Sequence, residues 1–210
     1  MKKELKNRFC TLLETYTANT SLIDDLWNNL EKRYSEKHRT YHNLKHLKEL
    51  FDYFDFHHEQ LENPNIVAFS IFYHDIIYNI WKKDNEEKSA DLAIKVLSEL
   101  QLSQSQFNTT HEQIIATKTH ESNFNDSKFL IDFDLAILGQ SEEIYQEYSQ
   151  SIRKEYKLVP DFMYKKGRIK VLQHFINKKN IYKTAVFIAS FEKNAKENLQ
   201  GELNQLLHGI

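Results

Sequence analysis

The chain has 210 residues, 40% hydrophobic and 13% aromatic, which is typical of a globular protein and not of a disordered one. Its 28 basic and 30 acidic side chains nearly cancel, so the charge gives no support to binding a nucleic-acid polymer or an anionic membrane. Cys10, the only cysteine, excludes intrachain disulfides and cysteine-rich metal clusters. The sequence has neither an apolar signal segment near its start nor a run of 18 apolar residues, and we expect a cytoplasmic protein.

Helical periodicity recurs along most of the chain, and four glycines and two prolines leave few residues that break helices. An apolar stripe from Leu5 to Tyr16 predicts the first helix, and Ser21 begins a second one in a capping pattern with Asp24. Further helices are expected at 42–61, 65–79, 85–100, 109–120, 127–138, 141–157, 163–177 and 181–207, the last as one helix or two. The predicted fold class is therefore all-α.

The segment 39–46 contains two histidines, His42 and His46, four residues apart. Residues at this spacing lie on one face of a helix, and Leu50 and Tyr53 continue that face toward the expected core. Imidazole is a common ligand of divalent transition metals. The two histidines therefore suit either a pair of metal ligands or one ligand and one proton donor. Two partly exposed histidines without a shared function are the alternative.

The doublet His74-Asp75 falls within the helix expected at 65–79. The helix places four apolar or aromatic residues within roughly 60° of His74 on the helical wheel: Val67, Ile71, Ile77 and Tyr78. The imidazole is thus expected to point toward the core, with Asp75 one step round the helix. A core histidine hydrogen-bonded to a carbonyl oxygen is the alternative.

Two aspartates, Asp132 and Asp134, lie two residues apart in the apolar run 129–138. Residues at that spacing point to nearly opposite sides of a helix, so at most one is expected to reach a given site. Asp134 is flanked on the wheel by four aliphatic residues, Leu130, Ile131, Ile137 and Leu138. A carboxylate in an apolar face is costly unless a cation or strong donors meet it. We therefore predict Asp134 to be a metal ligand, with a helix-end hydrogen bond as the alternative.

These side chains together form a shell of nitrogen and oxygen donors. Such a shell suits a divalent ion, whether Mn, Mg, Fe, Co, Ni or Zn, with water in the open positions. One ion is expected, or two.

The order of these residues along the chain resembles the superfamily of metal-dependent phosphohydrolases named after their His-Asp doublet. The pattern Tyr41-His42-Asn43-x-x-His46 resembles the matching segment of the cyclic-nucleotide phosphodiesterases, and Asp134-Leu135 resembles the distal aspartate of that group. A closer likeness, over almost the whole chain, is to a bacterial family of predicted metal-dependent HD phosphohydrolases, through segments 41–43, 72–78, 84–90, 117–120, 132–139 and 152–156. The segment after the doublet departs from the phosphodiesterase pattern, which argues against cyclic nucleotides as substrates.

The resemblance implies an HD-domain helical bundle with N- and C-terminal helical extensions. Residues 1–210 would form one domain, with its core at about 38–140 and flanking helices in 1–37 and 141–210. The implied metal ligands are His46, His74, Asp75 and Asp134, and the implied general acid is His42. Asp75 would also orient the attacking water or bridge to a second ion.

Five further residues are candidates for a supporting role. Glu86 would hydrogen-bond water at the metal, or simply suit the positive end of a helix as a first-turn carboxylate. His120 would bind phosphate or a second ion, or serve as a histidine at a helix C-terminus. Arg39, Lys118 and Arg153 would contact phosphate, or remain solvated charges. Whether Asp132 or His120 joins the metal shell stays open.

The expected function is hydrolysis of a phosphate ester or anhydride, with a small-molecule phosphate, such as a nucleotide, as the substrate. A homodimer is compatible with the sequence, and no membrane or nucleic-acid polymer is expected as a partner. Two alternatives stand beside this reading. One is a non-catalytic metal-binding or scaffold protein with the same helical fold. The other is an HD-type oxygenase or lyase with a di-iron centre.

Overall fold

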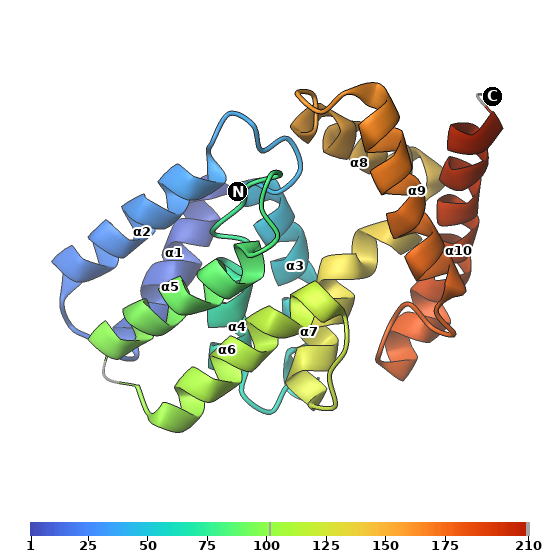
Figure 1. Ribbon diagram of the computed structural model, residues 1–210. Helices are drawn as coiled ribbons and strands as arrows, with labels where there is room; N and C mark the ends of the chain where they lie inside the picture. Colours follow the sequence, from blue (N-terminus) through green and yellow to red (C-terminus); the bar gives the residue numbers. More distant parts are fainter. Residues whose placement is uncertain (101, 209–210) are drawn as a thin grey trace. The chain divides into compact units, whose positions relative to one another are not determined.

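The computed structural model describes residues 1–100 and 102–208. These residues form ten α-helices and two short 3-10 helices, with no strand among them (Figure 1). The predicted all-α fold class is thereby confirmed. In chain order the elements are α1 (Lys2–Glu14), α2 (Thr20–Tyr34), α3 (Leu44–His57), η1 (His58–Gln60), α4 (Pro64–Tyr73), α5 (Asn85–Glu99), α6 (Gln104–Thr119), α7 (Asn125–Leu135), η2 (Ala136–Gly139), α8 (Glu142–Glu155), α9 (Asp161–Asn177) and α10 (Ala185–His208).

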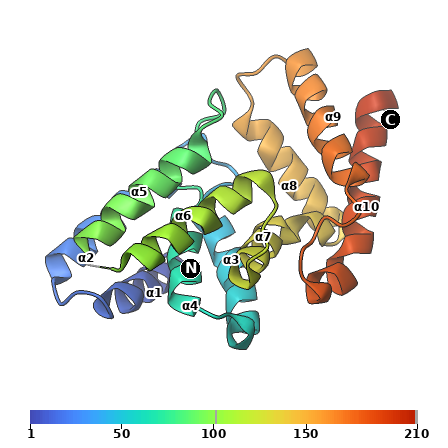
Figure 2. The same ribbon diagram turned by 60° about the horizontal axis from the view of Figure 1, so that its bottom comes forward.

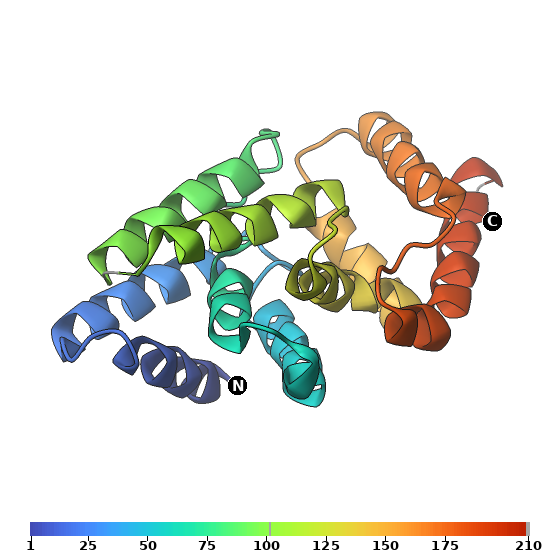
Figure 3. The same cartoon turned by 90° about the horizontal axis from the view of Figure 1, so that it is seen from below.

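The chain divides into two compact units, Met1–Phe133 and Asp134–Ile210. In the first unit α5 and α6 lie side by side, and α4 packs against both (Figures 2 and 3). The N-terminal helices belong to this core, since the ring of Phe9 on α1 contacts Trp27 on α2 and Phe72 on α4. The single domain over 1–210, with its core at about 38–140, stays a prediction, because compactness alone does not define a domain.

Two helices begin at capping residues that the sequence reading did not select. The second helix starts after Asn19, whose side chain accepts a hydrogen bond from the backbone of Leu22 at 3.1 Å, so Ser21 lies inside the helix. The sixth helix begins at Gln104 and not at 109, because Ser103 and Gln106 form a reciprocal capping box. Both caps satisfy N–H groups that the first helical turn leaves without partners.

In the second unit α9 packs against α10, and η2 lies against α10. A methyl group on Gly139 would come within 2.6 Å of Phe191 Cβ and 2.8 Å of Tyr182 Oη, so this glycine permits the close approach of η2 and α10. The Asn198 amide joins the same two elements by donating to the carbonyl oxygens of Leu138 and Gln140, both at 2.9 Å. The predicted final helix is one helix, not two.

None of the helices in the described part of the chain combines the length and the apolar character that crossing a membrane requires.

Candidate metal centre

The first histidine pair lies at the start of α3. Asn43 caps the helix by accepting a hydrogen bond from the backbone of Lys45 at 2.8 Å, which places His46 in the first turn with only 1% of its surface exposed. His42 lies in the turn before the helix. The expectation that His42 and His46 share one face of a helix is therefore wrong. The turn nevertheless brings their rings to a centroid distance of 5.7 Å.

The His-Asp doublet directly follows α4, which ends at Tyr73 and not at 79. The backbone N–H of His74 still donates to Ser70 at 2.8 Å, and the doublet then begins a turn. His74 Nδ1 lies 2.9 Å from the carbonyl oxygen of Ile71. When Nδ1 carries the proton and donates to that oxygen, Nε2 keeps its lone pair for a metal. The contact with a carbonyl and the role of metal ligand are thus compatible, and not alternatives.

The two aspartates of α7 are buried in the opposite order to the one expected. Asp132 is fully buried, whereas Asp134 is half-buried in the last turn. The wheel argument failed because the helix is covered on nearly all sides: Phe129, Leu130, Ile131, Phe133 and Leu135 are all buried. Asp134 has a carboxylate oxygen within 4.8 Å of ligand atoms on His46 and His74.

Four side chains converge at this place. His46, His74, Asp75 and Asp134 each offer one ligand atom, and these atoms all lie within 4.8 Å of one another. Asp75 Oδ2 lies 3.3 Å from His74 Nε2 and 3.9 Å from His46 Nε2. The division between the two units falls inside α7, so Asp134 is carried by the last turn of a helix whose preceding residues belong to the first unit.

The donor set fits a divalent ion. Two imidazole nitrogens and two carboxylate oxygens suit a hard or borderline cation. Both histidines are buried with 1% exposure, while both aspartates are only half-buried. The two aspartates thus keep part of their surface accessible to solvent. The group could therefore hold a metal ion, and the residues predicted as ligands are the four that the structure brings together.

Arg39 does not lie with its guanidinium open to solvent, as a phosphate-binding residue would. Its side chain is fully buried, and Nε pairs with Glu36 Oε2 at 3.0 Å. Nη1 donates to the carbonyl oxygens of Asp75 at 2.6 Å and His42 at 3.4 Å, and Nη2 donates to Ile76 at 2.9 Å. One guanidinium thus joins the backbone that carries His42 to the backbone that carries the doublet. Its geometry is that of a positioning residue.

An aromatic stack orients His42, and the sequence reading missed it. The ring of Tyr78 lies against the His42 ring at a centroid distance of 4.3 Å. His38 stacks on Tyr78, and its Nε2 lies 3.2 Å from the Tyr78 carbonyl oxygen. His42 Nε2 is then 4.0 Å from Asp75 Oδ2. The position of Tyr78 three residues after Asp75 was the one available signal.

Glu86 and Lys118 lie near the doublet but do not form part of the four-residue group. Burial raises the pKa of Glu86 above its ordinary value, and the charge of Asp75 adds to the rise while that of Lys118 opposes it. Lys118 Nζ lies 3.9 Å from Glu86 and 2.5 Å from Glu87, and it donates to the carbonyl oxygen of Lys83 at 2.6 Å. A role for Glu86 beside the metal, and for Lys118 toward phosphate, stays a prediction.

The two remaining candidates lie in separate places. His120 ends α6 in the left-handed conformation, with φ of 52°, as a helix C-cap. Arg153 belongs to the second unit, where it donates to the carbonyl oxygen of Tyr156 at 2.7 Å, pairs with Asp161 and lies over the ring of Tyr164. These contacts occupy the Arg153 guanidinium within its own unit. Phosphate binding by His120 or Arg153 stays a prediction.

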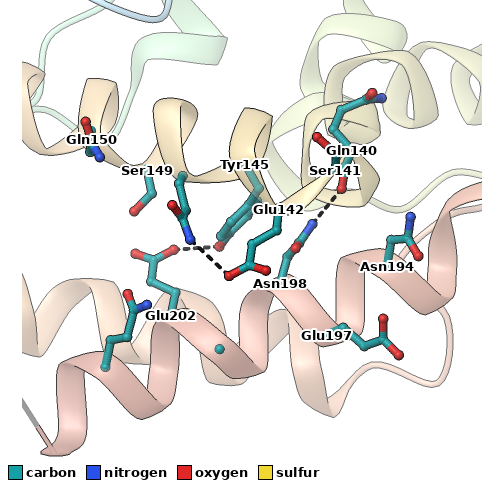
Figure 4. A pocket seen from close by; sticks show the side chains of 13 residues that line it. Gln140, Ser141, Glu142, Tyr145, Ser149, Gln150, Asn194, Glu197, Asn198 and Glu202 are labelled. Carbon is teal, nitrogen blue, oxygen red and sulfur yellow. Dashed lines mark hydrogen bonds between the residues drawn. The ribbon is translucent and has the colours of Figure 1, made fainter. Parts of the chain in front are cut away.

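The second unit holds a groove of about 500 Å³ between α8 and α10 (Figure 4). Its lining is rich in amides and carboxylates, most of them exposed. The buried Glu202 at its base accepts two hydrogen bonds from Arg168, both at 2.8 Å, and one from Tyr145 at 2.5 Å. Although burial acts to raise it, these hydrogen bonds and the charge of Arg168 hold the pKa of Glu202 below its ordinary value. This carboxylate is therefore neutralised within the protein.

No family model, no curated protein and no solved structure matches the chain.

Proposed function

We propose that the chain is a metal-dependent phosphohydrolase that cleaves a phosphate ester or anhydride. The observation that carries the proposal is the convergence of two histidines and two aspartates within 4.8 Å, with a further histidine, His42, 4.0 Å from one of the carboxylates. A divalent ion in such a shell lowers the pKa of a bound water and polarises a phosphoryl oxygen. The resemblance to the HD phosphohydrolases supports the same chemistry.

The residues of the chain divide the remaining tasks. His46 and His74 hold their rings in place through burial, and His74 is fixed further by the carbonyl oxygen of Ile71. Asp75 faces both histidines and His42, so it can orient the attacking water as well as bind the ion. His42 protonates the leaving oxygen, a task that histidine often performs as a general acid.

The backbone around His42 has to be rigid for this transfer. A proton donor must lie within hydrogen-bond reach of the oxygen that leaves, and a turn residue has no helix to fix it. Arg39 supplies the link by donating to the backbone of His42 and of Asp75, while Tyr78 holds the ring from one face. Both contacts support a role for His42 as the acid and not as an additional surface histidine.

A screen of phosphate monoesters, diesters and nucleotides with added Mn²⁺ or Mg²⁺ tests the proposal. We expect turnover by the wild-type protein and none by Asp75→Ala. Asp52→Ala is the matched control, because Asp52 is an exposed carboxylate on α3. No turnover by the wild type, or equal turnover by Asp75→Ala, would contradict the proposal and favour a non-catalytic metal-binding protein.

Two further measurements separate the roles within the site. We expect His42→Ala to retain the metal and to lose roughly 10²- to 10⁴-fold in kcat, with His111→Ala, an exposed histidine of α6, as the control. Loss of metal from His42→Ala would reassign this residue as a ligand. An absorption spectrum of aerobically purified protein tests for the di-iron alternative, since oxidised iron would absorb in the visible range.

A further inference from the structure

A cavity of about 350 Å³ lies in the first unit between α6, the start of α4 and the start of α7. It shares no residue with the metal centre. Its lining includes Glu62, Glu112, Gln113, Phe124 and Asp126. Its volume falls within the range of small-molecule sites, which runs from roughly 300 to 1,000 Å³.

Gln113 is the residue of this cavity whose buried polar side chain lacks a hydrogen-bond partner in the described part of the chain. Its side chain is fully buried, and neither amide oxygen nor amide nitrogen has a hydrogen-bond partner among residues 1–100 and 102–208. An unsatisfied buried amide is costly, because no hydrogen bond compensates for its removal from water. Because the amide makes no hydrogen bond, turning the side chain toward a molecule in the cavity breaks none. Such rotamer changes are common when ligands bind.

Two carboxylates of the cavity, those of Asp126 and Glu112, are already engaged. Asp126 accepts hydrogen bonds from the backbones of Glu62 and Asn63, at 2.8 and 2.7 Å. Glu112 accepts hydrogen bonds from the hydroxyl groups of Ser122, at 2.8 Å, and of Ser127. Gln113 differs from these groups, since among the described residues it is the buried polar side chain of the lining that makes no hydrogen bond.

The charged and aromatic residues of the lining indicate which class of ligand the cavity would bind. Three carboxylates line the cavity, and its lining contains neither lysine nor arginine, so an anion such as a nucleotide phosphate is disfavoured. Phe124 contributes a ring that is 66% exposed and is available for stacking against a planar heterocycle. A glutamine amide pairs with the adjacent amino group and ring nitrogen of adenine.

We infer that this cavity is a second ligand site that takes an amino-substituted nucleobase, without its phosphate, through Gln113 and Phe124. The nucleobase amino group donates to the Gln113 oxygen, and its ring nitrogen accepts from the Gln113 amide. The nearby carboxylates favour the amino-bearing edge. This inference is independent of the proposed hydrolase function, because none of the metal ligands takes part.

Thermal unfolding of the full chain with adenine, in the presence of a chelator to exclude binding at the metal centre, tests the inference. We expect adenine to raise the Tm of the wild-type protein. N6,N6-dimethyladenine, which lacks the donor, should bind about tenfold more weakly or worse. Absence of any adenine-dependent shift in the wild type, or equal affinity for the dimethylated base, would overturn the inference.

Two variants locate the binding. Gln113→Leu should raise or leave unchanged the Tm of the free protein, because it removes an unsatisfied buried amide, and it should abolish the shift with adenine. Phe124→Ala changes an exposed side chain and should fold normally, so it can test the site even if Gln113→Leu does not fold. We expect the affinity of Phe124→Ala for adenine to be about fivefold lower than that of the wild type, or lower still. Phe162→Ala, at a 74% exposed phenylalanine of α9, is the control. Wild-type affinity in Phe124→Ala, or in a folded Gln113→Leu, would refute the site.

Discussion

The two units of the molecule bury charged groups in different ways. In the second unit Arg168 and Glu202 neutralise each other through two hydrogen bonds of 2.8 Å. In the first unit Asp75 lies beside the buried histidines His46 and His74. Asp134, the residue that directly follows this unit, completes the four-residue group, which contains neither an arginine nor a lysine. Removing a charge from water is costly in either case. The second unit meets that cost within the chain, whereas the four-residue group could meet it with a bound cation, as we propose.

The largest effect is expected at the metal centre. Asp134→Ala should abolish metal retention after dialysis, measured as metal per protein, and a chelator should then no longer lower the Tm. In the wild type, a metal present at a thousandfold its Kd adds about 4 kcal/mol of stability, which chelation removes. If a chelator lowers the Tm of the wild type and of Asp134→Ala equally, Asp134 is not a metal ligand.

The ion pair between Arg168 and Glu202 in the second unit should contribute stability that does not depend on a chelator. Glu202→Ala leaves Arg168 buried without its partner, and we expect unfolding free energy to fall by about 3 to 5 kcal/mol, measured in urea with and without chelator. The double variant Arg168→Met with Glu202→Leu should lose less, because no uncompensated charge remains. A chelator-dependent loss for Glu202→Ala would show that the two units are not distinct in this respect.

Substituting two glycines of the second unit tests the close packing of η2 against α10. Gly139→Ala would force a methyl group against Phe191 and Tyr182, and we expect a loss of about 1 to 3 kcal/mol from overpacking. Gly201→Ala is the matched control, since nothing lies within 4 Å of its added methyl group, and alanine there should be neutral or stabilising. If both variants behave alike in urea unfolding, the close contact of η2 with α10 is not what Gly139 provides.

The smallest effect concerns a buried histidine of the first unit. Burial lowers the pKa of His57 from its ordinary value of 6.5. The unfolded chain then binds a proton at a higher pH than the folded chain does, so stability is full above about pH 6.5 and declines as the pH falls below it. His57→Phe should weaken this decline in urea titrations between pH 7.5 and 5. An unchanged pH dependence would exclude His57 as its source.

Much of the fold was predictable because helices follow a repeating pattern. The all-α class and most of the helix positions followed from apolar periodicity and from the scarcity of glycine and proline. The errors lie at the helix ends. The helix expected at 65–79 ends at Tyr73, because apolar residues continue past its last turn and conceal the end. The missed start at Gln104 depended on the cap formed by Ser103 and Gln106, a local signal that the apolar pattern does not include.

The four predicted ligands lie close together, but two of the structural arguments that predicted their positions were wrong. The expected helical face shared by His42 and His46 does not exist, and their proximity comes from a turn. The wheel argument for Asp134 assumed one apolar face, whereas α7 is buried nearly all round. The link made by Arg39 was beyond the reach of sequence patterns, because it joins residues 36 or more positions apart through backbone oxygens.

The position of His74 at the C-terminal end of α4 bears on the order of events at the metal centre. The carbonyl end of a helix carries a partial negative charge, and here it lies beside Asp75, the next residue in the chain. An incoming phosphate meets an unfavourable potential there until a cation has bound, whereas the cation is attracted from the start. Binding is therefore expected to be ordered, with the metal first and the phosphate second, and phosphate alone should be a poor ligand of the chelated protein.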